Sequence, residues 1–112
     1  MREPVLNRQL VLETPQLSPD GAGGHVTSWQ VLGSLWAEMR AGTGRERADG
    51  ELPVAQQMWR ITVPAAPYGA PSRPRPEQRF REGVRIFRIL SVAEADPEGR
   101  FLTCIAKEEV LT

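Results

Sequence analysis

The chain is poor in the residues from which most catalytic and metal sites are built. Its 112 residues include one cysteine and one histidine. The lone Cys104 excludes a disulfide within the chain, and its apolar neighbours predict a buried thiol. His25 has no second histidine or cysteine to complete a metal set, and its glycine-rich surroundings would hold a catalytic base poorly. We therefore predict no catalytic residues, no metal site and no cofactor, and we do not expect an enzyme.

Long apolar runs and an excess of one charge are also missing. No stretch approaches the roughly 18 apolar residues of a membrane helix, and the first residues do not resemble a secretory signal. We expect a soluble protein made in a reducing compartment, with no membrane partner. The formal net charge is +0, but arginines gather in residues 73–88 and acidic side chains in residues 94–112. This segregation predicts a basic edge and an acidic edge, which would suit like copies packed side by side in a ring.

Arginine supplies thirteen of the fourteen basic residues. Codon bias in the source genome is one interpretation, and contact with phosphates or carboxylates is the other. The stretch 73–88 would attract a phosphate backbone without reading its bases. Only Phe80 and Tyr68 lie nearby for stacking, which disfavours a dedicated single-strand binder. Ring lining, salt bridges between subunits and simple solubility all stay open for this stretch. The candidate contacts with DNA in a channel, or with a neighbouring ring, are Arg73, Arg75, Arg79 and Arg81.

Alternating apolar and polar residues predict strands and almost no helix. The expected strands span residues 9–13, 26–40, 58–63, 80–92 and 100–108, with a further short strand or turn edge at 79–83. We expect Thr14 and Pro15 to end the first strand, and one or two helical turns over residues 51–57. The fold class is mainly β: a small antiparallel β-barrel of about six strands, with neighbours in sequence paired, long loops and at most one short helix. A sandwich is the alternative.

Three further segments complete this single domain of residues 1–112. Residues 1–7 are expected to form an arm. Residues 18–24 hold three glycines, which predicts a loop with positive φ angles. Residues 64–77 form a loop rich in proline and arginine, whose five prolines exclude a regular element.

The long second strand is predicted to bend at Gly33, which would allow a bulge in a closing barrel. One parity of this strand is expected to face the core. Its members are Trp29, Val31, Leu35, Ala37 and Met39.

The stretch 80–92 is the strongest sign of assembly. We predict one strand that is apolar on both faces, with Phe87 and Ile89 on one side and Val84, Ile86, Leu90 and Val92 on the other. A short chain without helices has little to cover a second apolar face, so a neighbouring copy is the expected cover. The predicted subunit or ring interface comprises Trp36, Ile86, Arg88, Leu90 and Phe101.

The order of short motifs resembles the phage head–tail joining proteins, also called head–tail adaptor, head closure or stopper proteins. The likeness is strongest to those encoded by gene transfer agents, and it covers residues 6–109. The motifs that carry it are Leu6–Glu13, Asp20–Gly24, Trp29, Leu35–Glu38, Gly44–Glu46, Trp59–Val63, Arg79–Val92, Phe101–Cys104 and Glu108.

This resemblance implies a stopper that forms a homo-oligomeric ring, a hexamer, in the neck of a virion or gene transfer agent particle. The ring would lie between a portal or adaptor ring and the tail terminator or tail tube, retain packaged DNA and allow tail attachment. It also implies synthesis in the bacterial cytoplasm and possible non-specific contact with packaged double-stranded DNA. We expect the loop 64–76 to reach an adjoining ring or, alternatively, to turn inward toward DNA. Two competing interpretations are a different neck ring, either adaptor or tail terminator, and a stand-alone β-barrel that binds nucleic acid.

Overall fold

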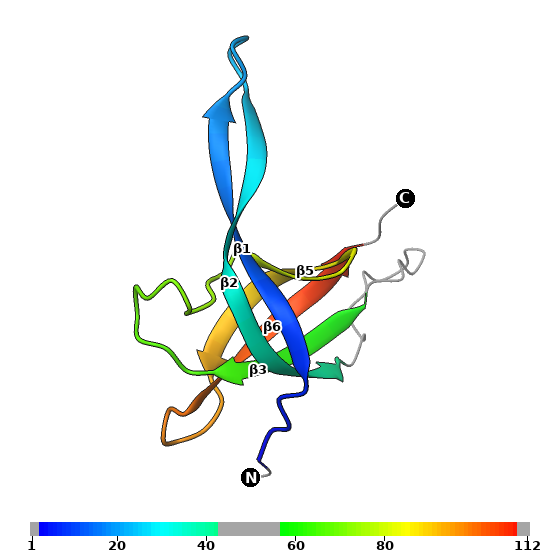
Figure 1. Ribbon diagram of the computed structural model, residues 1–112, viewed down its shortest axis with the longest axis vertical. Helices are drawn as coiled ribbons and strands as arrows, with labels where there is room; N and C mark the ends of the chain where they lie inside the picture. Colours follow the sequence, from blue (N-terminus) through cyan, green and yellow to red (C-terminus); the bar gives the residue numbers. More distant parts are fainter. Residues whose placement is uncertain (1–2, 43–56, 110–112) are drawn as a thin grey trace, which may run out of the picture.

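The structure, a computed structural model, describes residues 3–42 and 57–109. Six antiparallel strands form one sheet that closes into a barrel in the order β1-β2-β3-β6-β5-β4 (Figure 1). The strands are β1 (Arg8–Pro19), β2 (His25–Ala41), β3 (Met58–Pro64), β4 (Arg79–Glu82), β5 (Arg85–Glu94) and β6 (Phe101–Glu109). The predicted mainly β, six-stranded barrel is confirmed. The helical turns expected over residues 51–57 lie outside the described residues, except for Gln57, which is not helical.

Pairing of neighbours in sequence holds for only part of the barrel. β3 pairs with β6 instead of β4, and β4 closes the barrel by pairing with β1. The segment 65–78 provides the long connection between β3 and β4, and its residues, all described, form turns without a strand. The prediction that prolines exclude regular structure from residues 64–77 is confirmed except at Pro64, which ends β3. Two side chains of the segment nevertheless belong to the interior, because Pro74 and Gln78 are both buried.

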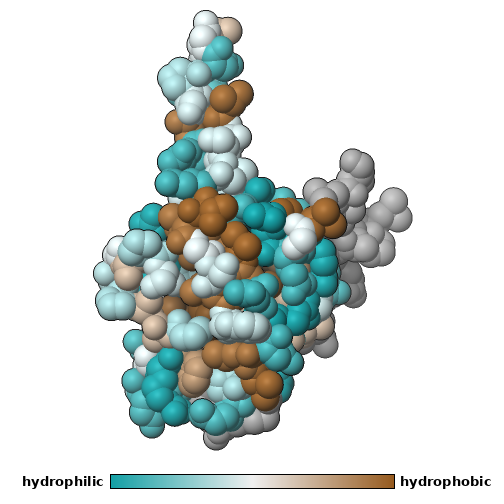
Figure 2. All heavy atoms as spheres, viewed as in Figure 1, coloured by the Kyte–Doolittle hydropathy of each residue, from teal (hydrophilic) through white to brown (hydrophobic). Residues whose placement is uncertain are grey.

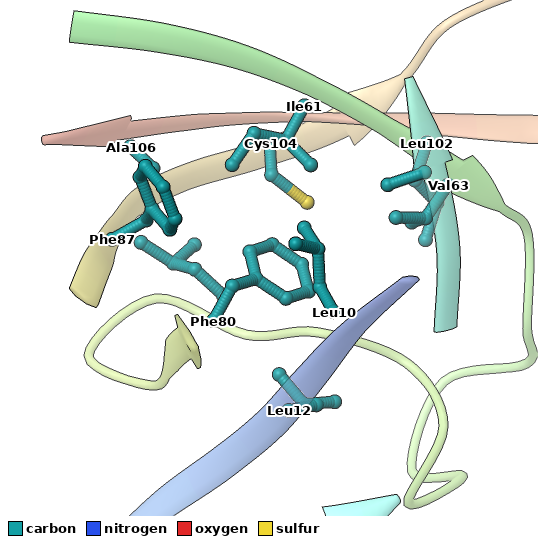
Figure 3. Close-up of a cluster of buried hydrophobic side chains, with 11 residues drawn as sticks. Leu10, Leu12, Ile61, Val63, Phe80, Phe87, Leu102, Cys104 and Ala106 are labelled. Carbon is teal, nitrogen blue, oxygen red and sulfur yellow. The ribbon is translucent and has the colours of Figure 1, made fainter. Parts of the chain in front are cut away.

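Apolar side chains from all six strands meet inside the barrel (Figure 3). Phe80 lies beside Leu10 of β1, and Phe87, its partner across β4 and β5, lies near Ala106 of β6. The alternation of strands explains this, since every second side chain points inward. Burial raises the pKa of the Cys104 thiol to about 12. Cys104 is 0% exposed, so the predicted buried thiol is confirmed.

The β1–β2 hairpin runs far beyond the barrel (Figure 1). The prediction that β1 stops at Thr14 and Pro15 is wrong, because β1 continues to Pro19, which pairs with His25. β1 meets β4 only over Val11–Glu13, so its later residues form an edge. A proline at such an edge costs no ladder hydrogen bond, which explains why the strand survives it.

The turn of this hairpin uses the predicted glycines. Gly21 and Gly23 have φ angles of 83° and 88°. The Asp20 Oδ1 atom accepts hydrogen bonds from the backbone N–H groups of Ala22 and Gly24, at 2.8 and 3.0 Å. These bonds lower the pKa of the Asp20 carboxyl. The turn therefore satisfies its one carboxylate internally.

A bulge at Gly33 divides β2 into two parts. Leu12 pairs with Gly33 and Glu13 with Val31, so Leu32 has no partner on β1, and Gly33 has a φ angle of 149°. The predicted bulge is confirmed. It changes the parity of the strand: Leu35, Ala37 and Met39 pack in or against the core as predicted, whereas Val31 is 55% exposed. The prediction that Val31 and Trp29 face the core is therefore wrong.

The stretch 80–92 is a hairpin and not one strand. A two-residue turn at Gly83 and Val84 joins β4 to β5, and Gly83 has the positive φ angle, 61°, that the first central residue of a type II′ turn requires. A second irregularity leaves Leu90 without a partner between Ile89 and Ser91. The apolar pattern on both faces therefore arises from a turn and a bulge, neither of which shows in the alternation alone.

Candidate assembly surfaces

Two of the predicted DNA-contacting arginines are paired within the protein. Glu13, only 4% exposed, accepts hydrogen bonds from Arg79 Nε at 2.7 Å and from Arg81 Nε at 2.9 Å. Burial alone would raise the pKa of Glu13, but these two hydrogen bonds and charges bring it below its ordinary value. The Arg79 guanidinium also lies 4.0 Å from the centre of the Trp29 ring. We call these four residues the Glu13 cluster; it ties β4 to the hairpin, and its one carboxylate cancels one of the two arginine charges.

Arg73 and Arg75 lie apart from that cluster, on the loop between β3 and β4. They line an open hollow of about 220 Å³ together with Thr14, Leu32 and Gln78. Arg73 donates to the Ala66 carbonyl at 2.8 Å, and its guanidinium stacks 3.8 Å from the Tyr68 ring centre. Arg75 is exposed. The structure thus brings the four predicted arginines together in two separate pairs.

The predicted interface residues fall on two sides of the barrel. Trp36, on β2, is 52% exposed, and Leu90, in the β5 bulge, is 46% exposed. Phe101 starts β6 and is half-buried. Because the strand order is β1-β2-β3-β6-β5-β4, β2 and β5 lie on opposite sides. The protein therefore offers two candidate contact surfaces and not one.

The other two predicted interface residues, Ile86 and Arg88, are respectively buried and paired within the chain. Ile86 is only 7% exposed and offers little surface. Arg88 forms an ion pair with Glu77, whose hydrogen bond raises the pKa of the arginine. Their role in an interface stays a prediction.

A second ionic cluster links β1, β3, β4, β5 and β6. Glu108 accepts hydrogen bonds from Arg85 Nε at 2.9 Å and from Trp59 Nε1 at 3.0 Å. Arg8 forms two bonds with Glu82, at 2.6 and 2.9 Å, and Arg85 lies 3.7 Å from the same carboxylate. The hydrogen bond from Arg85 lowers the pKa of Glu108, and that from Arg8 lowers the pKa of Glu82. Several of the arginines of the basic stretch thus stabilise the closed sheet.

The sequence prediction missed the projecting hairpin as a surface. Figure 2 shows apolar surface where the hairpin joins the barrel and along its stem. Leu17 is 69% exposed, Val26 54% and Val31 55%. A signal was present in the sequence: between Glu13 and Glu38, the only ionisable residues are Asp20 and His25. Charge depletion over so many residues is typical of the centre of an interface.

One like-charge pair also escaped prediction. Arg40 of β2 and Arg60 of β3 are direct partners in register, which is destabilising without a compensating anion. Glu38 lies 3.5 Å from Arg40, and all three line an open hollow of about 290 Å³ near the N-terminal arm. Within residues 3–42 and 57–109, no three His, Cys, Asp or Glu side chains group as metal ligands. In the same part of the chain, no helix has the length and apolar character to cross a membrane.

The N-terminal arm lies against the barrel without forming a strand. The Asn7 backbone N–H donates to the Ala37 carbonyl at 3.0 Å, and the Val5 N–H donates to Glu38 Oε2 at 3.0 Å. These bonds fix the described residues of the arm beside β2.

Comparisons with known proteins connect this geometry to phage-like particles. The family model described as phage head completion protein matches residues 1–109. A chain of the solved structure "Virion of native gene transfer agent (GTA) particle" is 57% identical, with a TM-score of 0.82; the match covers 98% of this chain and 100% of that one. Comparison with the curated proteins found no match. The resemblance seen in the sequence motifs is confirmed, and the chain belongs to the phage head completion protein family.

Proposed function

We propose that this protein is a stopper: a ring protein of the particle neck that retains packaged DNA and allows the tail to attach. The observation that carries this proposal is the near-complete match to a chain of a gene transfer agent virion, at 57% identity, within the head completion family. The proposed location is the neck, between a portal or adaptor ring and the tail terminator or tail tube.

The surface of the protomer supports a ring. Its two candidate contact surfaces lie on opposite sides of the barrel, around Trp36 and around Leu90. A contact between unlike surfaces repeats around an axis and closes when the rotation per copy divides a full turn. Six copies would satisfy this requirement, and we propose a hexamer.

Contact with DNA would be electrostatic and independent of sequence. The Glu13 carboxylate holds Arg79 and Arg81 and cancels one of their two positive charges, so we assign the main phosphate contact to the loop arginines Arg73 and Arg75. Such contacts release counterions, and their strength falls steeply with salt. Two arginines per protomer, repeated around a ring, would give a weak positive girdle that a sliding duplex passes.

The test is deletion of the gene followed by electron microscopy of the particles. A stopper that is missing leaves heads that fill and then lose their DNA and carry no tails. Complementation with the wild-type gene should restore tailed, DNA-filled particles. Normal, infectious particles from the deletion strain would refute the proposal.

The alternative within the neck is an adaptor or a tail terminator. Adaptors are expected to be richer in helix, whereas the part of this chain that the structure describes contains six strands and no helix. Full heads that keep their DNA but lack tails would favour a terminator. A stand-alone nucleic-acid module predicts a monomer with salt-dependent DNA affinity and no defect in particle assembly.

A further inference from the structure

The projecting part of the β1–β2 hairpin has two faces of different polarity. Residues opposite one another in register share a face. One face carries the pairs Glu13–Val31, Pro15–Trp29, Leu17–Thr27 and Pro19–His25. The other face carries Thr14–Gln30, Gln16–Ser28 and Ser18–Val26. The second face is mostly polar, and its Gln16 and Gln30 side chains are joined by a 2.7 Å hydrogen bond. The first face is mostly apolar.

The apolar face continues the outer surface of the barrel. Leu12 points into the core, so its neighbour Glu13 points outward, together with its partner Val31. Trp36 also lies on this outer surface. An outer surface that faces water is normally the polar one. Here it becomes apolar where the hairpin leaves the barrel, and Leu17, Val31 and Trp36 stay more than half exposed. We name this the hairpin stripe: Trp36, Val31, Trp29, Pro15 and Leu17.

The β2 edge of the projecting hairpin has few of the devices that keep an exposed sheet edge from binding other chains, apart from the bulge at Gly33. The edge of β2 from His25 to Ala37 has no proline, lysine, arginine or acidic residue. In the described chain, β2 pairs with β3 only from Glu38 onward, which leaves that edge without a strand partner. A two-stranded ribbon is marginal by itself in water. Contact with another surface would therefore stabilise the projecting hairpin.

A matching surface lies on the opposite side of the same barrel. Val92 and Cys104 pair and face inward, so the flanking pairs Ser91–Ile105 and Ala93–Thr103 face outward. These four side chains are uncharged, three of them are small, and the exposed Leu90 adjoins them. In the strand order β1-β2-β3-β6-β5-β4, the β5–β6 pair stands across the barrel from the β1–β2 pair. Arg60 of β3, the register partner of Ile105, borders this surface, and Arg79 lies over Trp29 of the stripe. Two surfaces with few charges on opposite sides of one barrel suit a heterologous contact between copies.

We propose that the hairpin stripe of one protomer docks on the β5–β6 surface of the next copy, so that the hairpin is the arm that links the ring. This inference rests on the ring assembly proposed above and adds its contact surfaces. Asp20, the only acidic group on the arm beyond Glu13, is satisfied within its own turn. No unpaired carboxylate is therefore buried when the arm docks.

Photo-crosslinking tests which protein covers the stripe. A benzoylphenylalanine replaces Leu17 on the apolar face or, as the matched control, Ser28 on the polar face of the same ribbon. Both full-length variants are irradiated as concentrated protein and in particles. We expect covalent dimers of this chain from position 17, with the crosslinked peptide in residues 90–105, and far fewer from position 28. Equal yields from both faces, capture of a different particle protein, or no crosslink in particles would overturn the proposal.

Charged substitutions give an independent readout. Leu17→Asp should lower the yield of tailed, DNA-filled particles by at least about tenfold, because a leucine buried in an interface contributes that much to binding. Ser28→Asp should leave the yield unchanged, and both variants should unfold at the wild-type temperature because both sites are exposed. If Leu17→Asp gives a normal yield while the deletion strain is still defective, the hairpin does not link the ring, although the protein can still be a stopper. If the deletion strain itself makes normal particles, the proposal that the protein is a stopper is wrong.

Discussion

Replacing Glu13 by alanine is the most direct test of how the projecting hairpin is held to the barrel. The Glu13 side chain is 6% exposed and bonds two guanidinium groups, at 2.7 and 2.9 Å. Loss of one member of a fully buried pair costs about 3–5 kcal/mol, and a hydrogen bond to a charged group contributes about 1.5–3 kcal/mol. Here Arg79 and Arg81 keep 19% and 35% of their side-chain exposure, so water partly solvates them after the change. We therefore expect Glu13→Ala to lower the free energy of unfolding by about 2–3 kcal/mol.

The assay is urea unfolding followed by circular dichroism, with thermal melts as a second measure. A loss of this size should lower the melting temperature by about 10 °C or more for a domain of this length. Glu98→Ala is the matched control, because Glu98 lies exposed in the β5–β6 turn and its removal deletes the same charge. A double-mutant cycle with Arg81→Ala should show a coupling of about 1 kcal/mol. If Glu13→Ala and Glu98→Ala unfold at the same urea concentration, the Glu13 cluster does not stabilise the barrel and this reasoning fails.

Three further predictions concern the whole barrel. The hydrogen bonds that lower the pKa values of Glu13, Glu82 and Glu108 stabilise the fold at neutral pH, and this stability should be lost as pH falls below the ordinary carboxyl pKa of about 4.3. Urea midpoints should therefore fall between pH 7 and pH 3, and midpoints that do not change with pH would contradict this prediction. The Cys104 thiol, with its pKa raised to about 12, should resist thiol reagents at pH 8 until denaturant is added, and rapid labelling of the native protein would show that it is accessible. Gly83→Ala should cost about 1 kcal/mol through its φ angle of 61° alone, since no atom crowds an added Cβ; an unchanged urea midpoint would disprove the turn geometry.

The sequence predicted the strands well because burial on one side imposes a period of two. The inward residues Ile61, Val63, Leu102 and Cys104 alternate without interruption in β3 and β6. Both strands appear where the pattern placed them. Local patterns fail where a bulge or turn resets the parity, as at Gly33 and Gly83. Gly33 was correctly predicted to bulge, yet the resulting outward turn of Val31 did not follow from the pattern alone.

Long-range pairing accounts for most of what the sequence could not show. The stretch 73–88 looked more basic than it is because one of its partner acids lies far away in the sequence: Glu13 is 66 residues from Arg79 and 68 residues from Arg81. Only closure of β4 onto β1 brings them together. β1 likewise read as ending at Pro15, because nothing local reveals that the strand is at an edge where proline is tolerated. The projecting β1–β2 hairpin was not predicted for that reason, although the scarcity of ionisable residues between Glu13 and Glu38 could be seen in the sequence.

Reconstruction of the particle neck by cryo-electron microscopy tests the central claim most directly. The account predicts a ring of barrels between the portal complex and the tail, with the β1–β2 hairpin of each copy lying on the β5–β6 surface of the next. A neck without this chain, or a single copy bound elsewhere on the particle, would contradict it.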